Sequence, residues 1–447
     1  MDRLMRRDSL AELIDWARGV RCEDLPVPVR AASKNTLVNT LAAMLGGSNA
    51  PGAIEGVRQV RHWGGRPEST VVIHGFKAPA PLAAFANGVM AHALDYDDTQ
   101  VGTGFHPNVS LVPALLAVAE TRSIPGNAFL AAHVAALEIA CRLTLAATNR
   151  QKHPWLTTTL FGVFGAALGA GLVQGLDAGR LRHALGIAYS SAGGNRQGLL
   201  DGAMIQRVQP GLSAQAAVAA VALAAQGVTG AHDILEGRYG LYPSHYGADY
   251  EPRQLLEGLG REFRMLDLAL KPYPCCSYSQ EPIEAALGLV REAGFDAQAV
   301  REIVVSVASQ HAAGLVDHPY APRGCAQVDA QFSLQYVIGA TALRGDLGLK
   351  DFQEAALHDP AVIDYSRRVR VVVDPKKEGT VELHMKDGSR RERRVTLARG
   401  PDLFGKLAEC AALAATPLPE ARVRALYDAA MGLENLADAT LLAQEAR

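Results

Sequence analysis

Long stretches rich in alanine, leucine and glycine fill the first 265 residues, and apolar side chains recur in them at helical spacing. The pattern is clearest in residues 127–148 (NAFLAAHVAALEIACRLTLAAT) and 213–225 (SAQAAVAAVALAA). In the second stretch we expect Ser213 to cap the first turn and Gly227 to end the helix. Because small side chains let helices approach closely and short breaks separate the segments, we expect antiparallel packing of neighbouring helices. This half of the chain therefore predicts a large helical domain.

The pattern changes near residue 268, where LKPYPCCSYSQ places two prolines that a helix cannot run through. Beyond it, the sequence predicts strands at residues 302–309, 367–374, 380–385 and 391–397, and helices at residues 281–293 and 329–343. The alternation of β-branched residues around the DPKKEG and KDGS turns indicates a small antiparallel sheet with helices on one face. This segment therefore predicts an α+β domain.

After Pro401 the helical pattern returns in residues 403–415, 419–431 and 437–445. A helical tail that follows an α+β insertion packs most economically on the first helical domain. We therefore predict a mainly α fold with an α+β lid. The large all-helical domain is built from residues 1–267 and 401–447, and the smaller inserted α+β lid domain spans residues 268–400.

Charge and composition exclude several classes of partner. Lys and Arg number 44 against 46 Asp and Glu, so no excess of positive charge suggests a nucleic acid or an anionic membrane as partner. The apolar runs 157–173 and 213–225 are short for a membrane span, and we interpret them as buried core helices. Six scattered cysteines, and a first segment in which acidic residues interrupt every apolar stretch and leave no signal-peptide core, favour a cytoplasmic protein.

Common cofactor and metal motifs are absent from the sequence. There is no GxxxxGK[ST] phosphate loop, no GxGxxG after a strand, no GxSxG elbow, and no HExxH or CxxC pattern. Cys275 and Cys276 are adjacent, which seldom makes a metal site without further ligands. We therefore expect no nucleotide, metal or other cofactor.

One polar segment is unusual for a helical domain: HALDYDDT at residues 92–99, followed by FHPN at residues 105–108. It holds three carboxylates within four residues, which repel one another unless donors or cations lie nearby, so such a cluster often marks a functional site. Pro107 at a helix start would place His106 where free N–H groups favour an anionic ligand. The alternative is that the aspartates are solvated helix caps and His106 is a surface residue.

The segments HALDYDDT and HPNVSLVPALLAVAE resemble the signature of the MmgE/PrpD family, which contains 2-methylcitrate dehydratase, cis-aconitate decarboxylase and iminodisuccinate epimerase. Further matching stretches follow in order: TLFGVFGAALGAGLVQGLD, DGAMIQRVQPGLSAQAAVAA, GVTGAHDILEGRYGLY, KPYPCCSYSQEPIEAAL and DAQFSLQYVIGATALRGDLGLKDF. The resemblance covers nearly the whole chain. It implies a helical domain built from both termini, an α+β lid, an active site in the cleft between them, and a homodimer.

The resemblance also implies which residues line the site. Four positions match those of the decarboxylases: Asp95, Thr99, His106 and Lys271. Arg207 is retained as well, and Cys276 stands where the decarboxylase carries a histidine. Basic residues of the family are missing at four other positions: Leu156, Gln206, Gln209 and Gln280.

The missing cations suggest a hypothesis about the substrate. Each buried carboxylate needs a cation or several donors, so glutamines in place of Lys and His favour a substrate with fewer carboxylates or one held differently. In that interpretation Gln206 and Cys276 contact the substrate. The alternative is that Gln206 and Gln209 are exposed residues at a helix start.

The function that follows is a cofactor-independent lyase acting on a small carboxylate by proton abstraction α to a carboxylate, with dehydration or decarboxylation to follow. His106 would be the general base or acid, with Asp95 orienting or tuning it. Lys271 and Arg207 would hold carboxylate and stabilise the enolate-like charge, and Thr99 would donate a hydrogen bond. Two alternatives stay open: an epimerase or isomerase on the same scaffold, and a catalytically degenerate member that binds a metabolite.

Overall fold

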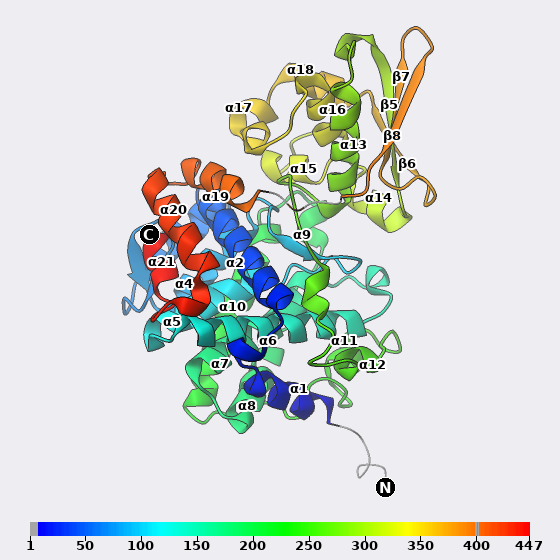
Figure 1. The fold of residues 1–447 in the computed structure, drawn as a ribbon. Helices are drawn as coiled ribbons and strands as arrows, with labels where there is room; N and C mark the ends of the chain where they lie inside the picture. Colours follow the sequence, from blue (N-terminus) through cyan, green and yellow to red (C-terminus); the bar gives the residue numbers. More distant parts are fainter. Residues whose placement is uncertain (1–7, 398–399, 401) are drawn as a thin grey trace.

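The computed structural model describes residues 8–397, 400 and 402–447. It shows a large body made mainly of helices and a smaller body of helices and strands at one end of it (Figure 1). The hydrophobic core of the large body contains residues from both ends of the chain, from Leu10 to Met265 and from Leu407 to Ala446. A second core, made by residues between Cys275 and Met385, fills the smaller body. These two parts are called the helical body and the small body below.

The helical body is built around four closely packed helices: α4 (Ala80–His92), α5 (Asn108–Arg122), α7 (Thr157–Gln174) and α10 (Ile205–Ala225). Small residues allow this approach, because a Cβ atom on Gly88 of α4 would lie 2.8 Å from the Cα atom of Gly211 in α10. The surrounding helices are α1 (Ser9–Gly19), α2 (Val27–Gly47), α3 (Ala53–Trp63), α6 (Gly126–Ala146) and α8 (Ala178–Tyr189), with the short α9 (Gln197–Leu200), α11 (Leu241–His245) and α12 (Arg253–Leu256).

Helix α10 differs from the expected helix of residues 213–225. It begins at Ile205 and runs through Pro210, so Ser213 lies inside the helix instead of capping it. The Ser213 hydroxyl donates to the carbonyl of Thr159. The helix ends at Ala225, and Gly227 follows with a φ of 95°. Tertiary contacts with α4 and α7 therefore extend this helix toward its N-terminus, beyond the start that the local sequence pattern predicts.

The C-terminal helices lie against the N-terminal part of the chain. They are α19 (Leu403–Ala412), α20 (Glu420–Met431) and α21 (Leu441–Glu445). Figure 1 shows them, in orange and red, beside the blue α2. Leu407 and Cys410 of α19 are fully buried in the core of the helical body.

The helical body is not all-helical, which corrects the prediction. It carries a hairpin of β1 (Ser69–Val71) and β2 (Phe76–Ala78). It also carries an antiparallel pair of β3 (Asp98–Gln100) and β4 (Leu268–Leu270). Because β4 pairs with β3, the first residues assigned to the lid by the sequence lie on the helical body.

The small body contains a four-stranded sheet with the order β6, β5, β7, β8. The strands are β5 (Val300–Val307), β6 (Val369–Val373), β7 (Thr380–Met385) and β8 (Arg390–Arg394). The expected antiparallel sheet is in fact mixed, because β5 and β6 run parallel. The chain between β5 and β6 makes a long helical crossover, which is the connection that parallel strands require.

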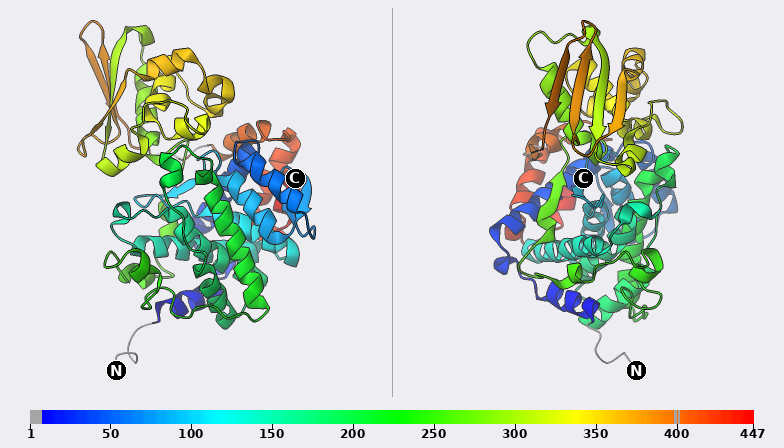
Figure 2. Two further views of the ribbon diagram at one scale, coloured as in Figure 1. Left: turned by 180° about the vertical axis from the view of Figure 1, so that it is seen from behind. Right: turned by 90° about the vertical axis from the view of Figure 1, so that its right-hand side faces the viewer.

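Helices cover one face of this sheet (Figures 1 and 2). They are α13 (Gln280–Val290), α14 (Gln310–Val316), α15 (Ala326–Gln331), α16 (Leu334–Arg344), α17 (Glu354–Leu357) and α18 (Pro360–Ser366). The single helix expected at residues 329–343 is divided into α15 and α16. The break is fixed by Ser333, whose side chain accepts a hydrogen bond from the N–H of Tyr336 and so caps α16.

Three helices are long and apolar enough to cross a membrane: α6, α7 and α10. In α6 and α7, 89% of the most apolar 18-residue stretch is buried inside the protein, as expected for core helices. Helix α10 is different, because only 50% of its apolar stretch is buried inside the protein. The expectation that residues 213–225 form a buried core helix is therefore wrong for the outer face of α10.

Candidate active site

The loop after α4 and the segment before α5 position the polar residues of HALDYDDT and FHPN. Helix α4 ends at His92, and the following loop leads through Asp95 and Asp97 into β3. Asp95 adopts a left-handed backbone with a φ of 48°, a conformation that aspartate tolerates better than most residues. The chain then returns to His106, directly before α5. Pro107 is the N-cap of α5, one position earlier than expected.

Asp97 is the central carboxylate of this site and is fully buried. Its Oδ2 accepts a hydrogen bond from Nδ1 of His106 at 2.7 Å, and its Oδ1 accepts one from Nδ1 of His92 at 3.1 Å. The prediction that Asp95 orients His106 is therefore wrong. The orienting residue is Asp97, and His92 is a second imidazole that the sequence reasoning did not single out.

Burial favours the neutral form of His106. Burial lowers the pKa of His106, and the nearby Lys271 and His92 lower it further, while the Asp97 carboxylate opposes them. The two imidazoles hold the pKa of Asp97 well below its ordinary value despite its burial. Since Nδ1 of His106 donates a hydrogen bond to Asp97, the lone pair on Nε2 is the basic site of the ring. This geometry leaves Nε2 of His106 able to accept a proton.

Lys271 follows β4 and reaches the same loop. Its Nζ donates to Oδ1 of Asp95 at 2.8 Å and to the Asp95 carbonyl at 2.9 Å, and its side chain is buried. Burial opposes the charged form, but Asp95 and Asp97 together raise the pKa of Lys271 above its ordinary value. The Asp95 Oδ2 atom is buried without a hydrogen-bond partner among the described residues. This pair therefore presents an ammonium group and a free carboxylate oxygen close to His106.

The first turn of α10 contacts both the site and the small body. Gln206 donates from Nε2 to Nε2 of His92 at 3.2 Å. The neighbouring Arg207 is completely buried and extends toward α15, where it donates to Gln327 Oε1 and Gln331 Oε1, each at 2.9 Å. Both residues are buried, so the alternative that Gln206 is a surface residue is wrong. Burial lowers the pKa of Arg207 to about 10, which leaves it charged at neutral pH.

Two further predicted site residues lie beside this cluster. Thr99 is buried in β3 and pairs with Ala269 of β4, two residues before Lys271. Cys276 is buried close to Asp95 and Lys271, and its N–H donates to the carbonyl of Gln331. Burial raises the pKa of the Cys276 thiol to about 12, so it stays protonated at neutral pH.

At the other positions where the basic residues of the family are missing, the two glutamines form hydrogen bonds with the backbone. Gln209 exchanges two hydrogen bonds with the backbone of Asn195 and is buried, so it too is not a surface residue. Gln280 donates to three carbonyls and accepts from Tyr273 N–H in the segment that links the two bodies. Leu156 is the N-cap residue of α7. The recorded contacts of these three residues do not include His106 or Lys271.

Lys406 of α19 joins the parts of the site, although the sequence analysis did not identify it. Its Nζ donates to the carbonyl oxygens of Tyr96 and Lys271 at 2.7 and 2.9 Å, and to Oδ1 of Asn39 at 2.7 Å. The ammonium also lies 3.4 Å from the centre of the Tyr96 ring. A single buried lysine in an apolar helix, FGKLAECAA, is the signal that could have indicated it.

A buried hydrogen-bond chain supports the site from behind. Asn108 donates to Oδ2 of Asp98, His133 Nε2 donates to Oδ1 of Asn108, and the Ser33 hydroxyl donates to His133 Nδ1. Burial lowers the pKa of His133 to about 4, so its ring is neutral. Burial and the neighbouring Asp97 raise the pKa of Asp98 to about 7.

Four of these side chains could also hold a metal ion. His92, Asp95, Asp97 and His106 each offer a ligand atom, and these atoms lie within 4.8 Å of one another. Imidazole and carboxylate ligands suit several divalent metals. However, both Asp97 oxygens already accept hydrogen bonds from imidazole, and the Lys271 ammonium contacts Asp95. The hydrogen bonds of the cluster thus occupy much of its metal-binding capacity.

The fold and this site define a protein with a large helical body, an inserted α+β body, and a buried cluster of histidine, aspartate, lysine and arginine where they meet. The MmgE/PrpD N-terminal domain matches residues 11–253 and the MmgE/PrpD C-terminal domain matches residues 273–409. The chain belongs to the MmgE/PrpD family.

Characterised relatives are similar over most of the chain. A cis-aconitate decarboxylase of Aspergillus terreus is 24% identical over 96% of this chain and 94% of its own length. A cis-aconitate decarboxylase-like protein, oryM, of Aspergillus oryzae is 26% identical over 79% of this chain and 77% of its own. The human cis-aconitate decarboxylase is 26% identical over 67% of this chain and 63% of its own.

Proposed function

We propose that this protein is a lyase that acts on a small carboxylate without a cofactor, by dehydration or decarboxylation. The observation that carries the proposal is the buried pair of His106 and Asp97 beside the buried pair of Lys271 and Asp95. The first pair is a base with a fixed tautomer, and the second presents a cation to a substrate carboxylate. The relatives that decarboxylate cis-aconitate support the same class of reaction.

The proposed chemistry needs one proton transfer at carbon. In a dehydration, His106 takes the α-proton, the electron pair forms the double bond, and the leaving hydroxide takes the proton back from the His106 imidazolium to become water. In a decarboxylation, His106 first takes a proton from solvent, the C–C bond breaks to release CO₂, and the electron pair left on carbon takes that proton from the imidazolium. In both reactions Lys271 stabilises the negative charge that develops on the carboxylate or enolate oxygens.

Epimerisation on the same residues is the second candidate. It needs proton removal and return but no leaving group, and the His92 and His106 rings, with centroids 5.1 Å apart, provide two bases. A binding protein without turnover is the third. We further propose that the protein is a cytoplasmic homodimer. One side of α10 carries the exposed Leu212 and Leu223 and the partly buried Ala216 and Ala219, and this apolar stripe supports burial against a second copy.

The test measures product and isotope exchange on a panel of small carboxylates that includes cis-aconitate, in D₂O. We expect loss of CO₂ or water from one member of the panel. His106→Ala should lower turnover about 100-fold or more, the size expected for loss of a general base, and the variant should fold. Deuterium incorporation without CO₂ or water loss would identify an epimerase. If no member of the panel shows turnover or deuterium exchange, the result favours a binding protein.

Lys271 needs a paired variant, because its removal alone leaves the Asp95 carboxylate buried without its cation. We therefore compare Lys271→Met with the double variant Lys271→Met/Asp95→Asn, in which both charges are gone. If Lys271 binds carboxylate, the double variant should fold and show a raised KM together with a lower turnover. Full activity of the double variant would contradict the proposed role.

A further inference from the structure

Arg207 is a buried cation that forms no salt bridge with a carboxylate of the described residues, and this separates it from the other fully buried arginine. Arg142 donates from Nε to the Glu138 carboxylate at 2.6 Å, and its terminal nitrogens donate to backbone carbonyls. Arg207 instead donates to three neutral acceptors: Gln327 Oε1, Gln331 Oε1 and the carbonyl of Pro51. No carboxylate of the described residues pairs with it. Buried charges in proteins are normally paired directly, whereas the Asp95 and Glu55 carboxylates act on Arg207 only at longer range.

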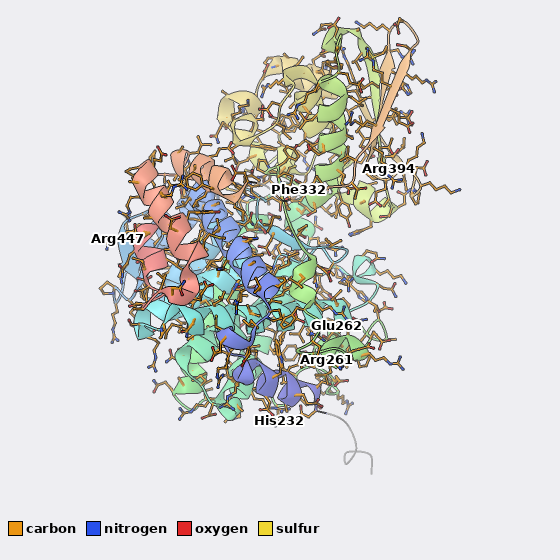
Figure 3. The ribbon with its side chains drawn as sticks, viewed as in Figure 1. His232, Arg261, Glu262, Phe332, Arg394 and Arg447 are labelled. Atoms are coloured by element: carbon orange, nitrogen blue, oxygen red, sulfur yellow. The ribbon has the colours of Figure 1, made fainter. Side chains whose placement is uncertain are left out.

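Two donors remain unused where Arg207 meets the small body. Nε of Arg207 and Nε2 of Gln331 are buried and have no hydrogen-bond partner among the described residues. The two side chains are joined by the hydrogen bond from Arg207 Nη2 to Gln331 Oε1, so their free donors lie near each other. Figure 3 shows Phe332, the residue after Gln331, at the end of the small body that faces the helical body.

The position of these donors relates them to the candidate site. The Asp95 carboxylate, which contacts Lys271, is close enough to Arg207 to influence its pKa. The N–H of Cys276 donates to the carbonyl of Gln331, which ties the segment after Lys271 to α15. A ligand held by Arg207 and Gln331 therefore lies beside the group of His106, Asp97 and Lys271.

We propose that Arg207 and Gln331 form a carboxylate-binding subsite shared by the two bodies, which holds a substrate carboxylate remote from the reacting carbon. A carboxylate supplies two oxygens to the guanidinium edge formed by Nε and Nη2, and the Gln331 amide adds a further donor. The anion also neutralises the buried charge of Arg207. The identity of this ligand as the substrate rests on the function proposed above.

Gln331 determines the specificity of this subsite, whereas Gln327 only positions Arg207. The Gln327 amide is fully used, because its Oε1 accepts from Arg207 and its Nε2 donates to the carbonyl of Phe352 at 2.9 Å. The Gln331 amide uses its oxygen in the same way but leaves its nitrogen free. The two glutamines thus form a matched pair of sites for substitution.

The test measures binding of two probes to the full-length protein by calorimetry. Succinate carries two carboxylates, and butyrate has the same carbon chain with one. We expect the wild type to bind succinate at least tenfold more tightly than butyrate. Gln331→Glu keeps the acceptor for Arg207 but replaces the free donor with a negative charge, so it should abolish this preference. Gln327→Glu adds the same charge beside Arg207 and so weakens anion binding as well, but it keeps the free Gln331 donor and should therefore retain clearly more of the preference than Gln331→Glu.

The outcomes distinguish this proposal from the proposed function. Equal effects of Gln331→Glu and Gln327→Glu, or a wild type that does not prefer succinate, would overturn the subsite even if the protein is an active lyase. Loss of the preference in Gln331→Glu alone would support the subsite even if no lyase activity is found. Once a substrate is known, Gln331→Glu should raise KM far more than it lowers kcat, because the subsite is remote from the reacting carbon.

Discussion

The stability of the protein should respond very differently to the same substitution at the two fully buried arginines. Arg142→Met removes the partner of the Glu138 carboxylate, which is itself fully buried, and leaves the carbonyls of Glu257 and Glu262 without their donors. Breaking a buried ion pair from one side typically costs about 3–5 kcal/mol. We therefore expect Arg142→Met to lower the free energy of unfolding by roughly this amount.

Arg207→Met should be nearly neutral for stability. It removes three hydrogen bonds to neutral oxygens, which contribute about 1 kcal/mol each. It also removes a buried charge whose pKa is lowered from 12.5 to about 10, which corresponds to a cost of roughly 3 kcal/mol. The two effects cancel to within about 1 kcal/mol, while ligand binding should be lost.

Urea unfolding followed by tryptophan fluorescence measures both variants in one assay, because Trp16, Trp63 and Trp155 all belong to the helical body. Far-UV circular dichroism confirms that each variant folds. The double variant Arg142→Met/Glu138→Gln is the control, and it should recover part of the lost stability because no charge stays unpaired. If Arg207→Met destabilises as strongly as Arg142→Met, Arg207 is a structural residue and its unpaired charge does not mark a ligand site.

Three further predictions concern pH, metal and assembly. His133 has its pKa lowered to about 4 in the folded state, so the unfolded state takes up a proton first as the pH falls, and stability is lost from about pH 6.5 downward. His133→Gln should therefore reduce the loss of unfolding free energy between pH 7 and pH 5 by about 2 kcal/mol, and equal slopes in both proteins would contradict this. Activity should survive dialysis against a chelator, whereas a loss that Zn²⁺ restores would show a metal held by His92, Asp95, Asp97 and His106. Sedimentation should show a dimer that Leu223→Asp, on the exposed face of α10, converts to a monomer, and an unchanged dimer would place the interface elsewhere.

Some local predictions failed where contacts distant in sequence overrode the pattern. Helix α10 begins at Ile205 because its first turns are buried against α4, where Gly88 and Gly211 allow close contact. The sheet of the small body is mixed because β5 and β6 are joined by a helical crossover. Spacing identifies a strand or a helix, but it does not say which partner the element finds.

The sequence by itself determined the family, through motifs such as HALDYDDT that span nearly the whole chain, and it identified His106, Lys271 and Arg207 as candidates. Tertiary structure alone decided how these residues pair. Lys271 contacts Asp95 across 176 positions because β4 pairs with β3, and this leaves Asp97 as the partner of His106. Packing likewise places Arg207 against the side chains of Gln327 and Gln331, so that no carboxylate of the described residues forms a salt bridge with it. The pairing of buried charges depends on distances set by the packed helices, and three aspartates within four residues are equivalent until the fold places each against its own donor.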